Sequence, residues 1–369
     1  LNFLDHHIKN GNAIVGLAHF EELQNGIASE AFKTLPGDDK VIAAEFKKRN
    51  TLERKTTQIS TYDIDNVDLD LQGLQKEFAE FTKMSEHTPD EITLKSETYK
   101  ALTQDKKWYR LNNLANLQVA QFFIPKTQEN KEKLTTNAKY RTYLNTGAQI
   151  QDRGTANFIA NKKRVFHWFL EFPEVFSNGG FDCILGNPPF LGGQKLSGEY
   201  GYPFTQFIQT KYSPIGSVDL VTYFFRRIFQ IIKDDGFQSL ISTNTIAQGD
   251  ARLGGLLFID NHGGDINHAV KSMKWPGIAA VEVSLITIFK GNWNKQYLLN
   301  NKNVKQINSL LTDSEPLGDP LALKSNDKKS FQGSIILGKG FVLNKEESEN
   351  LIKKDKKNAD VIFPFLNGQ

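Results

Sequence analysis

The feature that most constrains this chain is the alternation of short apolar runs with a long amphipathic segment between residues 163 and 291. Residues 181–185 form a short apolar run, which is typical of a buried strand in a parallel sheet. Residues 219–235 predict a strong helix, with Asp219 able to cap its start and Gly236 to end it. Further strands are predicted at residues 237–243 and 281–289. Strands that alternate with helices predict a doubly wound α/β sheet.

The region before this alternation has a different texture. Residues 13–15 form a short apolar run after a Gly-Asn turn, and we predict a strand there. From about residue 20 to 160, Lys, Glu, Asn, Gln and Thr dominate, and apolar residues recur at steps of three and four. The predicted helices span residues 39–53, 66–84, 90–104, 106–123 and 129–150. This block carries no cluster of catalytic residue types, so it is predicted to be a helical insertion. After residue 296 a Lys- and Asn-rich tail holds one charged helix, at residues 346–357.

Composition limits the classes of protein and site. The chain has 369 residues, a net charge of +3 and one cysteine, Cys183. One cysteine excludes an internal disulfide and a zinc cluster, and it fits a reducing cytoplasm. No apolar run approaches the roughly 20 residues that span a bilayer, and His6, His7 and His167 have no metal-ligand spacing. We therefore predict a cytoplasmic protein without a membrane or metal partner, and Cys183 is expected to be a core residue of its strand.

A stiff loop follows the first predicted strand. Asn187-Pro188-Pro189-Phe190 contains two prolines that fix φ and remove two backbone donors, while their carbonyl groups remain as acceptors. The carboxyl end of a sheet strand is where open α/β folds bind ligands. A ligand with a planar ring and an NH₂ group would suit the Asn187 carbonyl oxygen and the face of Phe190. The alternative is a tight structural loop with a buried phenylalanine.

These residues and their surroundings resemble a known enzyme family. The matching stretches are residues 166–176, 180–190, 218–226, 242–252 and 275–283, in order along the chain. They resemble the adenine-specific DNA methyltransferases of large restriction-modification enzymes, and the fused type IIG and Eco57I-like methylases are most similar. The resemblance implies an α/β fold with an incomplete Rossmann-like methyltransferase sheet and a large helical insertion, and S-adenosylmethionine as the methyl donor. It also implies double-stranded DNA as the substrate, within a restriction-modification or phage-defence system.

The resemblance also implies roles for individual residues. The Asn187 side-chain oxygen and the Pro188 carbonyl accept hydrogen bonds from the N6 amino group of an adenine flipped out of the duplex. Phe190 stacks on that base, and Pro189 completes the catalytic loop. Residues 8–16 are similar to the segment that follows the ribose-binding strand of the cofactor site. Within it Asn12 stands where the family often has Asp, so its oxygen could accept from the adenine of the cofactor, or Asn12 is simply a turn residue.

Weaker candidates surround the loop. Asn244 follows the next strand and could shape the adenine pocket, although it could equally cap the next turn. Trp275 is either a pocket wall or a core residue. Gln248, Arg252 and Lys195 are candidates for contacts with DNA phosphates, with a solvated surface position as the alternative.

The chain departs from the family pattern at its ends. The Gly-rich cofactor loop and the acidic ribose ligand of the family are absent from residues 1–369, and residues 361–368 resemble the start of a target-recognition region. We therefore expect an internal fragment that is inactive alone, with the missing parts of the polypeptide as partners. We expect a piece of the α/β core at residues 1–20, the helical insertion at 21–160 and the catalytic core at 161–295. Residues 296–369 are expected to be a linker and the start of the recognition region.

Two other functions use similar features. Glutamine-N5 methyltransferases of release factors have a similar Asn-Pro-Pro-aromatic loop, because an amide NH₂ poses the same chemical problem. They are small and lack such an insertion and the Trp275-Pro276-Gly277 block. A non-catalytic DNA-binding scaffold subunit is the remaining alternative, and the intact Asn187–Phe190 loop argues against it.

Overall fold

The computed structural model describes residues 3–56, 65–146, 153–275, 282–315, 323–329, 340 and 342–364. The chain divides into two compact units, Leu1–Glu315 and Pro316–Gln369, which are described separately. The boundary between them falls inside the segment 296–369 that the sequence sets apart as a linker and tail.

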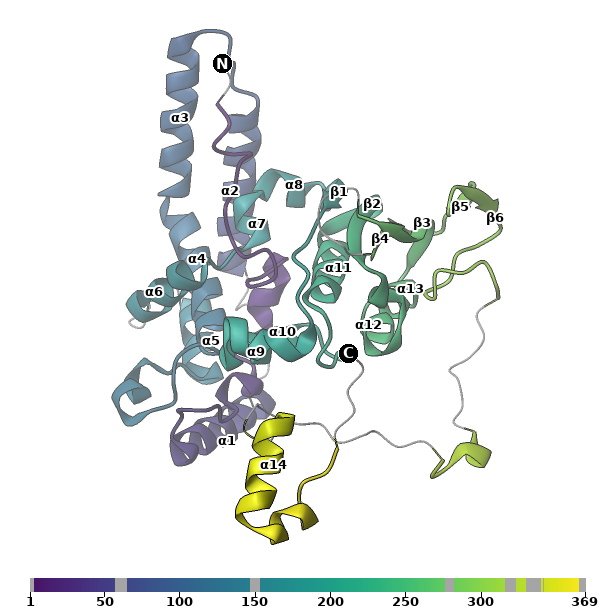
Figure 1. Cartoon of the computed structure of the whole chain (residues 1–369). Helices are drawn as coiled ribbons and strands as arrows, with labels where there is room; N and C mark the ends of the chain where they lie inside the picture. Colours follow the sequence, from purple (N-terminus) through teal and green to yellow (C-terminus); the bar gives the residue numbers. More distant parts are fainter. Residues whose placement is uncertain are drawn as a thin grey trace. The chain divides into compact units, whose positions relative to one another are not determined.

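Helices make up the first half of the larger unit. They are η1 (Phe20–Asn25), η2 (Ser29–Phe32), α1 (Lys40–Thr56), α2 (Asp65–Thr82), α3 (Pro89–Thr103), α4 (Lys106–Ala120), η4 (Gln128–Lys133), α5 (Asn137–Thr146), α6 (Arg153–Lys163), α7 (Trp168–Glu171) and α8 (Pro173–Ser177). Figure 1 shows α2 and α3 side by side as a long helical hairpin. Helices α1 to α4 confirm four of the five helices predicted for this block.

The fifth predicted helix, over residues 129–150, is confirmed only in part. The structure has η4, then an extended stretch, then α5, and residues 147–150 lie outside the described part. The backbone N–H of Thr135 donates to the Gln121 side chain at 2.9 Å, and that of Asn137 donates to Asn50 at 2.7 Å. These buried side-chain partners give the backbone an alternative to helical hydrogen bonds, which explains the break.

The strand predicted at residues 13–15 is also wrong. Only Asn12 forms a β-bridge, with Val165, and residues 13–16 form turns and bends. The backbone of this segment still pairs with the chain after α6: Phe166 N donates to Val15 O at 2.8 Å. Gly16 has a φ of 140°, a conformation that favours glycine and interrupts a regular strand.

A six-stranded mixed sheet forms the second half of the larger unit. Its strands are β1 (Phe181–Gly186), β2 (Ile232–Thr243), β3 (Gly264–Lys274), β4 (Glu282–Lys290), β5 (Tyr297–Leu299) and β6 (Lys302–Val304), in the order β1-β2-β4-β3-β5-β6. The β1–β2 and β3–β5 pairs are parallel, and the β2–β4, β3–β4 and β5–β6 pairs are antiparallel. The predicted α/β class and the strands at β1, β2 and β4 are confirmed, but the sheet is mixed rather than wholly parallel.

Short helices connect these strands. They are η5 (Gly193–Lys195), α9 (Leu196–Tyr200), α10 (Tyr202–Lys211), α11 (Leu220–Ile231), η6 (Asn244–Ala247), α12 (Gly249–Gly254) and α13 (Leu256–Asp260). Helix α11 was predicted to continue to Asp235, but it ends at Ile231, and β2 begins at once. The register of β1 against β2 jumps from Phe181↔Ile232 to Cys183↔Phe237, so the residues assigned to the last helical turn form a bulge. Asp235 in this bulge has a φ of 61°.

The first strand, β1, is less buried than its sequence suggests. Cys183 is exposed and Leu185 is 75% exposed, so the prediction that Cys183 is a core residue is wrong. Among the described strands β1 pairs only with β2 and lies at one end of the sheet. The face that carries alternate residues Cys183 and Leu185 is therefore uncovered in the described part of the chain.

The smaller unit contains η7 (Lys324–Asn326), α14 (Lys345–Lys354) and η9 (Lys356–Asp360). Asn344 caps α14, and Glu347 completes a capping box. This helix confirms the charged helix predicted in the tail, although it ends three residues earlier than predicted. No helix among the described residues is long and apolar enough to cross a membrane.

Candidate functional site

The Asn187–Phe190 loop leaves β1 at its carboxyl end. Pro188 is buried, whereas Asn187 and Pro189 are exposed and Phe190 is 37% exposed. The carbonyl oxygen of Leu191 accepts a hydrogen bond from Leu220 N at 2.8 Å, which ties the end of the loop to the first residue of α11. The loop is thus fixed by two prolines and by α11, while its asparagine and phenylalanine stay accessible to a ligand.

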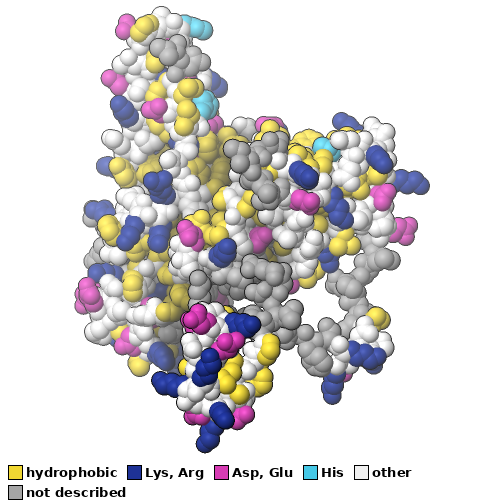
Figure 2. All heavy atoms as spheres, in the orientation of Figure 1, with side chains coloured by type: hydrophobic (Ala, Val, Ile, Leu, Met, Phe, Trp, Pro, Cys, Tyr) yellow, Lys and Arg dark blue, Asp and Glu magenta, His cyan; other side chains and the backbone are white. Residues whose placement is uncertain are grey.

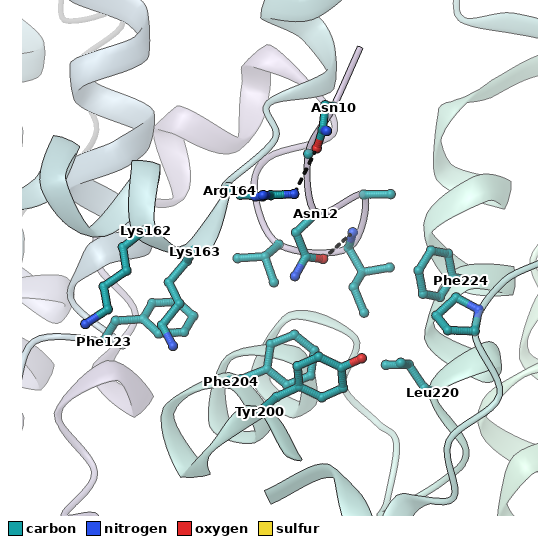
Figure 3. Close-up of a pocket in the computed structure, with 15 residues that line it drawn as sticks. Asn10, Asn12, Phe123, Lys162, Lys163, Arg164, Tyr200, Phe204, Leu220 and Phe224 are labelled. Atoms are coloured by element: carbon teal, nitrogen blue, oxygen red, sulfur yellow. Dashed lines mark hydrogen bonds between the residues drawn. The ribbon is translucent and has the colours of Figure 1, made fainter. Parts of the chain in front are cut away.

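A cavity of about 460 Å³ brings this loop together with the Asn12 segment. Pro189, Asn12 and residues of α9, α10 and α11 line this space, which we call the Asn12 cavity. Figure 3 shows Tyr200 and Phe204 opposite Asn12, with Leu220 and Phe224 on one side and Lys162 and Lys163 on the other. Asn12, expected to bind the cofactor, and Pro189 of the predicted catalytic loop therefore line the same cavity, whereas the other three residues of that loop do not line it.

Asn12 itself is held in a turn. Its backbone N–H donates to Arg164 O at 2.7 Å, and its side-chain oxygen accepts a long bond, 3.4 Å, from Ile14 N. Figure 3 shows the amide nitrogen pointing into the cavity. The group that faces the cavity is therefore a donor, and the oxygen that was expected to accept from the cofactor is turned to Ile14 N.

A buried network supports the Asn12 segment from behind. The Arg227 side chain of α11 is fully buried and donates to Gly16 O and to the Tyr212 hydroxyl, both at 2.8 Å. The Tyr212 hydroxyl in turn donates to Ile14 O at 3.1 Å. Burial raises the pKa of Tyr212, so it remains a neutral donor. One helix therefore supplies both a wall of the cavity and the anchor of the opposite segment.

His167 fixes the same segment from the other side. Its Nδ1 accepts from Leu17 N at 3.1 Å, and its Nε2 donates to the Asn116 side-chain oxygen at 2.9 Å. Burial, with a contribution from the nearby Arg227 charge, lowers the pKa of His167 to about 3. His167 is therefore a neutral structural residue, as the sequence spacing predicts.

A second space of about 430 Å³ lies between the chain after the loop and the segment that follows β2. Asp219 lines this space, which we call the Asp219 cavity. Lys195 and Gln248, two of the weak candidates, also line it and are exposed. Asp219 was predicted to cap α11, but its side chain instead accepts from the Thr243 and Thr245 hydroxyls, at 3.2 and 3.1 Å. This carboxylate joins the start of α11 to the end of β2.

The remaining candidates are less closely grouped. Asn244 is half-buried at the start of η6, and Trp275 is half-buried directly after β3. Arg252 donates to the Ser309 hydroxyl at 3.0 Å, so its guanidinium is partly engaged within the protein. Residues 276–281 and 365–369, which carry parts of the family resemblance, lie outside the described residues.

Sequence reasoning missed several residues of the Asn12 cavity. The rings of Tyr200 and Phe204 have their centres 4.7 Å apart and are tilted by 34°, and they come from α9 and α10, for which no helix was predicted. Lys162 and Lys163 end α6, and Arg164 follows them, just beyond the predicted insertion at residues 21–160 and at the start of the predicted catalytic core. In the sequence, the run of three cations at residues 162–164 was the one feature that could have indicated a binding site there.

Cys183 lines a separate space of about 380 Å³ beside Trp168 and Phe172. It lies on β1, outside the Asn187–Phe190 loop. Within the described residues, no group of three or more His, Cys, Asp or Glu side chains is placed to hold a metal ion.

Comparisons with known proteins place these features in a family context. The model of the Eco57I restriction-modification methylase family matches residues 42–262, which is more than half of the chain. No curated protein matches the sequence. Among solved structures, the chain is similar to the type IIL restriction-modification enzyme MmeI in complex with DNA. The TM-score is 0.38 and the identity 16%, over 85% of this chain and 47% of that one. The chain thus spans about half the length of that enzyme.

Proposed function

Because this chain belongs to the Eco57I restriction-modification methylase family, we propose that it methylates the N6 amino group of an adenine flipped out of duplex DNA. S-adenosylmethionine is the proposed methyl donor. The observation that carries the proposal is the Asn12 cavity, where Pro189 of the acceptor-rich loop and Asn12 meet. A restriction-modification or phage-defence system is the proposed setting.

The Asn12 cavity fits the adenosine end of the proposed cofactor. Its volume of about 460 Å³ lies within the range typical of small-molecule sites. The apolar side chains of Leu220 and Phe224 offer faces for a planar ring, and the Asn12 amide offers a polar group for the edge of that ring. When bound, S-adenosylmethionine supplies an electrophilic methyl group on a positively charged sulfur.

The Asn187–Phe190 loop would hold the target base. The Asn187 side-chain oxygen and the Pro188 carbonyl accept the two N6 hydrogens, which turns the nitrogen lone pair toward the methyl group. The exposed ring of Phe190 stacks on the base and compensates for the stacking lost when the base leaves the duplex. Bound S-adenosylmethionine would supply the methyl group to this nitrogen, and N6 would lose one proton to solvent.

The proposal is tested by Asn187→Ala in the protein that carries this chain. Loss of the acceptor oxygen is expected to lower the methylation rate by about 100-fold or more, because this oxygen orients the attacking nitrogen. DNA affinity is expected to change little. The matched control is Asn178→Ala, which removes an exposed asparagine just before β1 and should leave the rate unchanged. Equal loss of DNA binding and methylation would assign Asn187 a structural role.

A protein substrate is the competing outcome. If the protein methylated a glutamine amide of a release factor and left duplex DNA unmodified, the loop chemistry would stand but the substrate would be wrong. Measured DNA binding without any methyl transfer to DNA or protein would instead favour the scaffold alternative.

A further inference from the structure

A further cavity of about 570 Å³ opens along one face of α6, and we call it the α6 cavity. Thr155, Phe158, Ile159 and Lys162 recur at steps of three, one and three along α6 and all line it. This spacing places the four side chains on a single helix face. The opposite wall comes from the chain after α4, including Phe123, Asn130 and Lys133.

The lining of this cavity carries only positive charge. Lys133, Lys162 and Lys163 line it, and no Asp or Glu is among its described lining residues. Lys162 and Lys163 also line the Asn12 cavity, where Arg164 adds a fourth cation and again no described acid is present. By contrast, on the face of α2 and α3 that Figure 2 shows, Lys and Arg are interspersed with Asp and Glu. With a net charge of only +3, such an unbalanced cluster is a local feature.

The cations are arranged around aromatic rings. Phe158 is 66% exposed on α6, and Lys163 Nζ lies 5.6 Å from the centre of the buried Phe123 ring. Lys133 Nζ donates to the Asn130 side chain at 2.9 Å, and both residues line the cavity. An exposed aromatic ring among lysines is the combination by which proteins bind nucleic-acid strands, because the ring stacks and the cations neutralise phosphates.

We propose that the α6 cavity binds the DNA strand that carries the flipped base, with Lys162 and Lys163 against phosphates and Phe158 against a sugar or base. The proposal rests on the proposed function, because it takes DNA as the substrate of the neighbouring loop. It gives the helical block, which carries no catalytic residue types, a direct part in holding that substrate. The shared lysines place the strand contact next to the cavity proposed for the cofactor.

The test measures the affinity for duplex DNA as a function of salt concentration. Log affinity falls as log salt rises, and the double variant Lys162→Gln/Lys163→Gln is expected to make this slope less steep by about 0.9 for each lost phosphate contact. Phe158→Ala is expected to weaken binding roughly tenfold with an unchanged salt slope, since it removes stacking rather than charge. Both changes are at exposed or half-exposed positions and should leave the unfolding temperature unchanged. Lys100→Gln, at an exposed lysine of α3, is the matched control.

Each result decides between occupants. An unchanged salt slope in the double variant overturns the proposal, whatever the methylation assay shows. Weaker binding of S-adenosylmethionine with unchanged DNA affinity also overturns it, because the lysines would then serve the cofactor. A reduced slope in a protein that methylates no DNA would support the strand site while contradicting the proposed function, so the two failures are distinguishable.

Discussion

The two walls of the Asn12 cavity reach a defined conformation by different physical means. The Asn187–Phe190 loop, which contributes Pro189 to the cavity, is stiffened by its own covalent structure, because two prolines fix the backbone. The Asn12 wall is irregular and depends on residues far along the chain, chiefly His167 and Arg227. The stiffness of a loop that its own prolines fix can therefore be inferred from the sequence. The conformation of a segment that tertiary contacts hold cannot be inferred in this way.

The largest effect on stability is expected from Gly16→Ala, in the segment around Asn12 that tertiary contacts hold. Gly16 has a φ of 140°, and an added Cβ would lie 2.0 Å from the Phe166 carbonyl oxygen, so the segment must move. In the protein that carries this chain, we expect a loss of about 4 kcal/mol in the free energy of unfolding, together with weaker cofactor binding. Denaturant unfolding and calorimetry measure the two effects.

Gly37→Ala is the matched control for this change. Gly37 also has a positive φ, 92°, but nothing lies within 4 Å of the added Cβ. Its cost should be about 1 kcal/mol, from the backbone conformation alone. Equal costs at the two glycines would show that the packing of Gly16 against Phe166 is unimportant.

Arg227→Met is expected to have the next largest effect. It leaves Gly16 O and the Tyr212 hydroxyl without their buried donor, at a cost of about 2–3 kcal/mol in the free energy of unfolding. The KM for S-adenosylmethionine should rise more than kcat falls, because Arg227 positions the cofactor segment and touches no substrate. Arg227→Lys should rescue little, since one ammonium cannot replace the guanidinium fork. A fall in kcat alone would contradict the positioning role.

The same difference between local and tertiary determinants explains which parts of the fold and the site the sequence predicts. The loop, the α11 helix and the helices α1 to α4 follow from local patterns of proline, glycine and apolar spacing. The split of the 129–150 helix does not, because its cause is the Asn50 and Gln121 side chains. The exposure of Cys183 was missed because an apolar run shows that a strand forms but not which neighbours cover it. The α6 lysines were missed because a helix rich in polar residues gives no sign of its neighbours.

The pH dependence of stability isolates His167. Its pKa is about 3 in the folded protein and 6.5 when exposed, so the unfolded state takes up a proton first as the pH falls. The contribution of the neutral, buried His167 to the free energy of unfolding is therefore fully present above about pH 6.5. Below that pH, the free energy of unfolding falls by about 1.4 kcal/mol per pH unit. His167→Gln should be less stable at pH 7 and should lose this part of the slope. Unfolding curves at pH 7 and pH 5.5 measure both, and an identical slope in the variant would show that His167 is not buried as a neutral group.

The smallest change in stability is expected from a substitution in the Asn187–Phe190 loop. Pro188→Ala adds freedom to the unfolded chain and should cost about 0.5–1 kcal/mol. Methylation should nevertheless slow, because the carbonyl proposed to accept from N6 loses its fixed position. Pro89→Ala, at the exposed start of α3, is the control for an equal loss of stability without loss of rate. Equal rates in both variants would show that the stiffness of the loop does not serve catalysis.

The most direct test of the central claim identifies the methylated base. The protein that carries this chain is incubated with duplex DNA and S-adenosylmethionine bearing an isotopic label on its methyl group, and the digested nucleosides are separated by mass spectrometry. We predict that the label appears in N6-methyladenine and that Asn187→Ala removes it. A label found in a methylated cytosine, or in no nucleoside while the protein binds DNA, would contradict the proposed function.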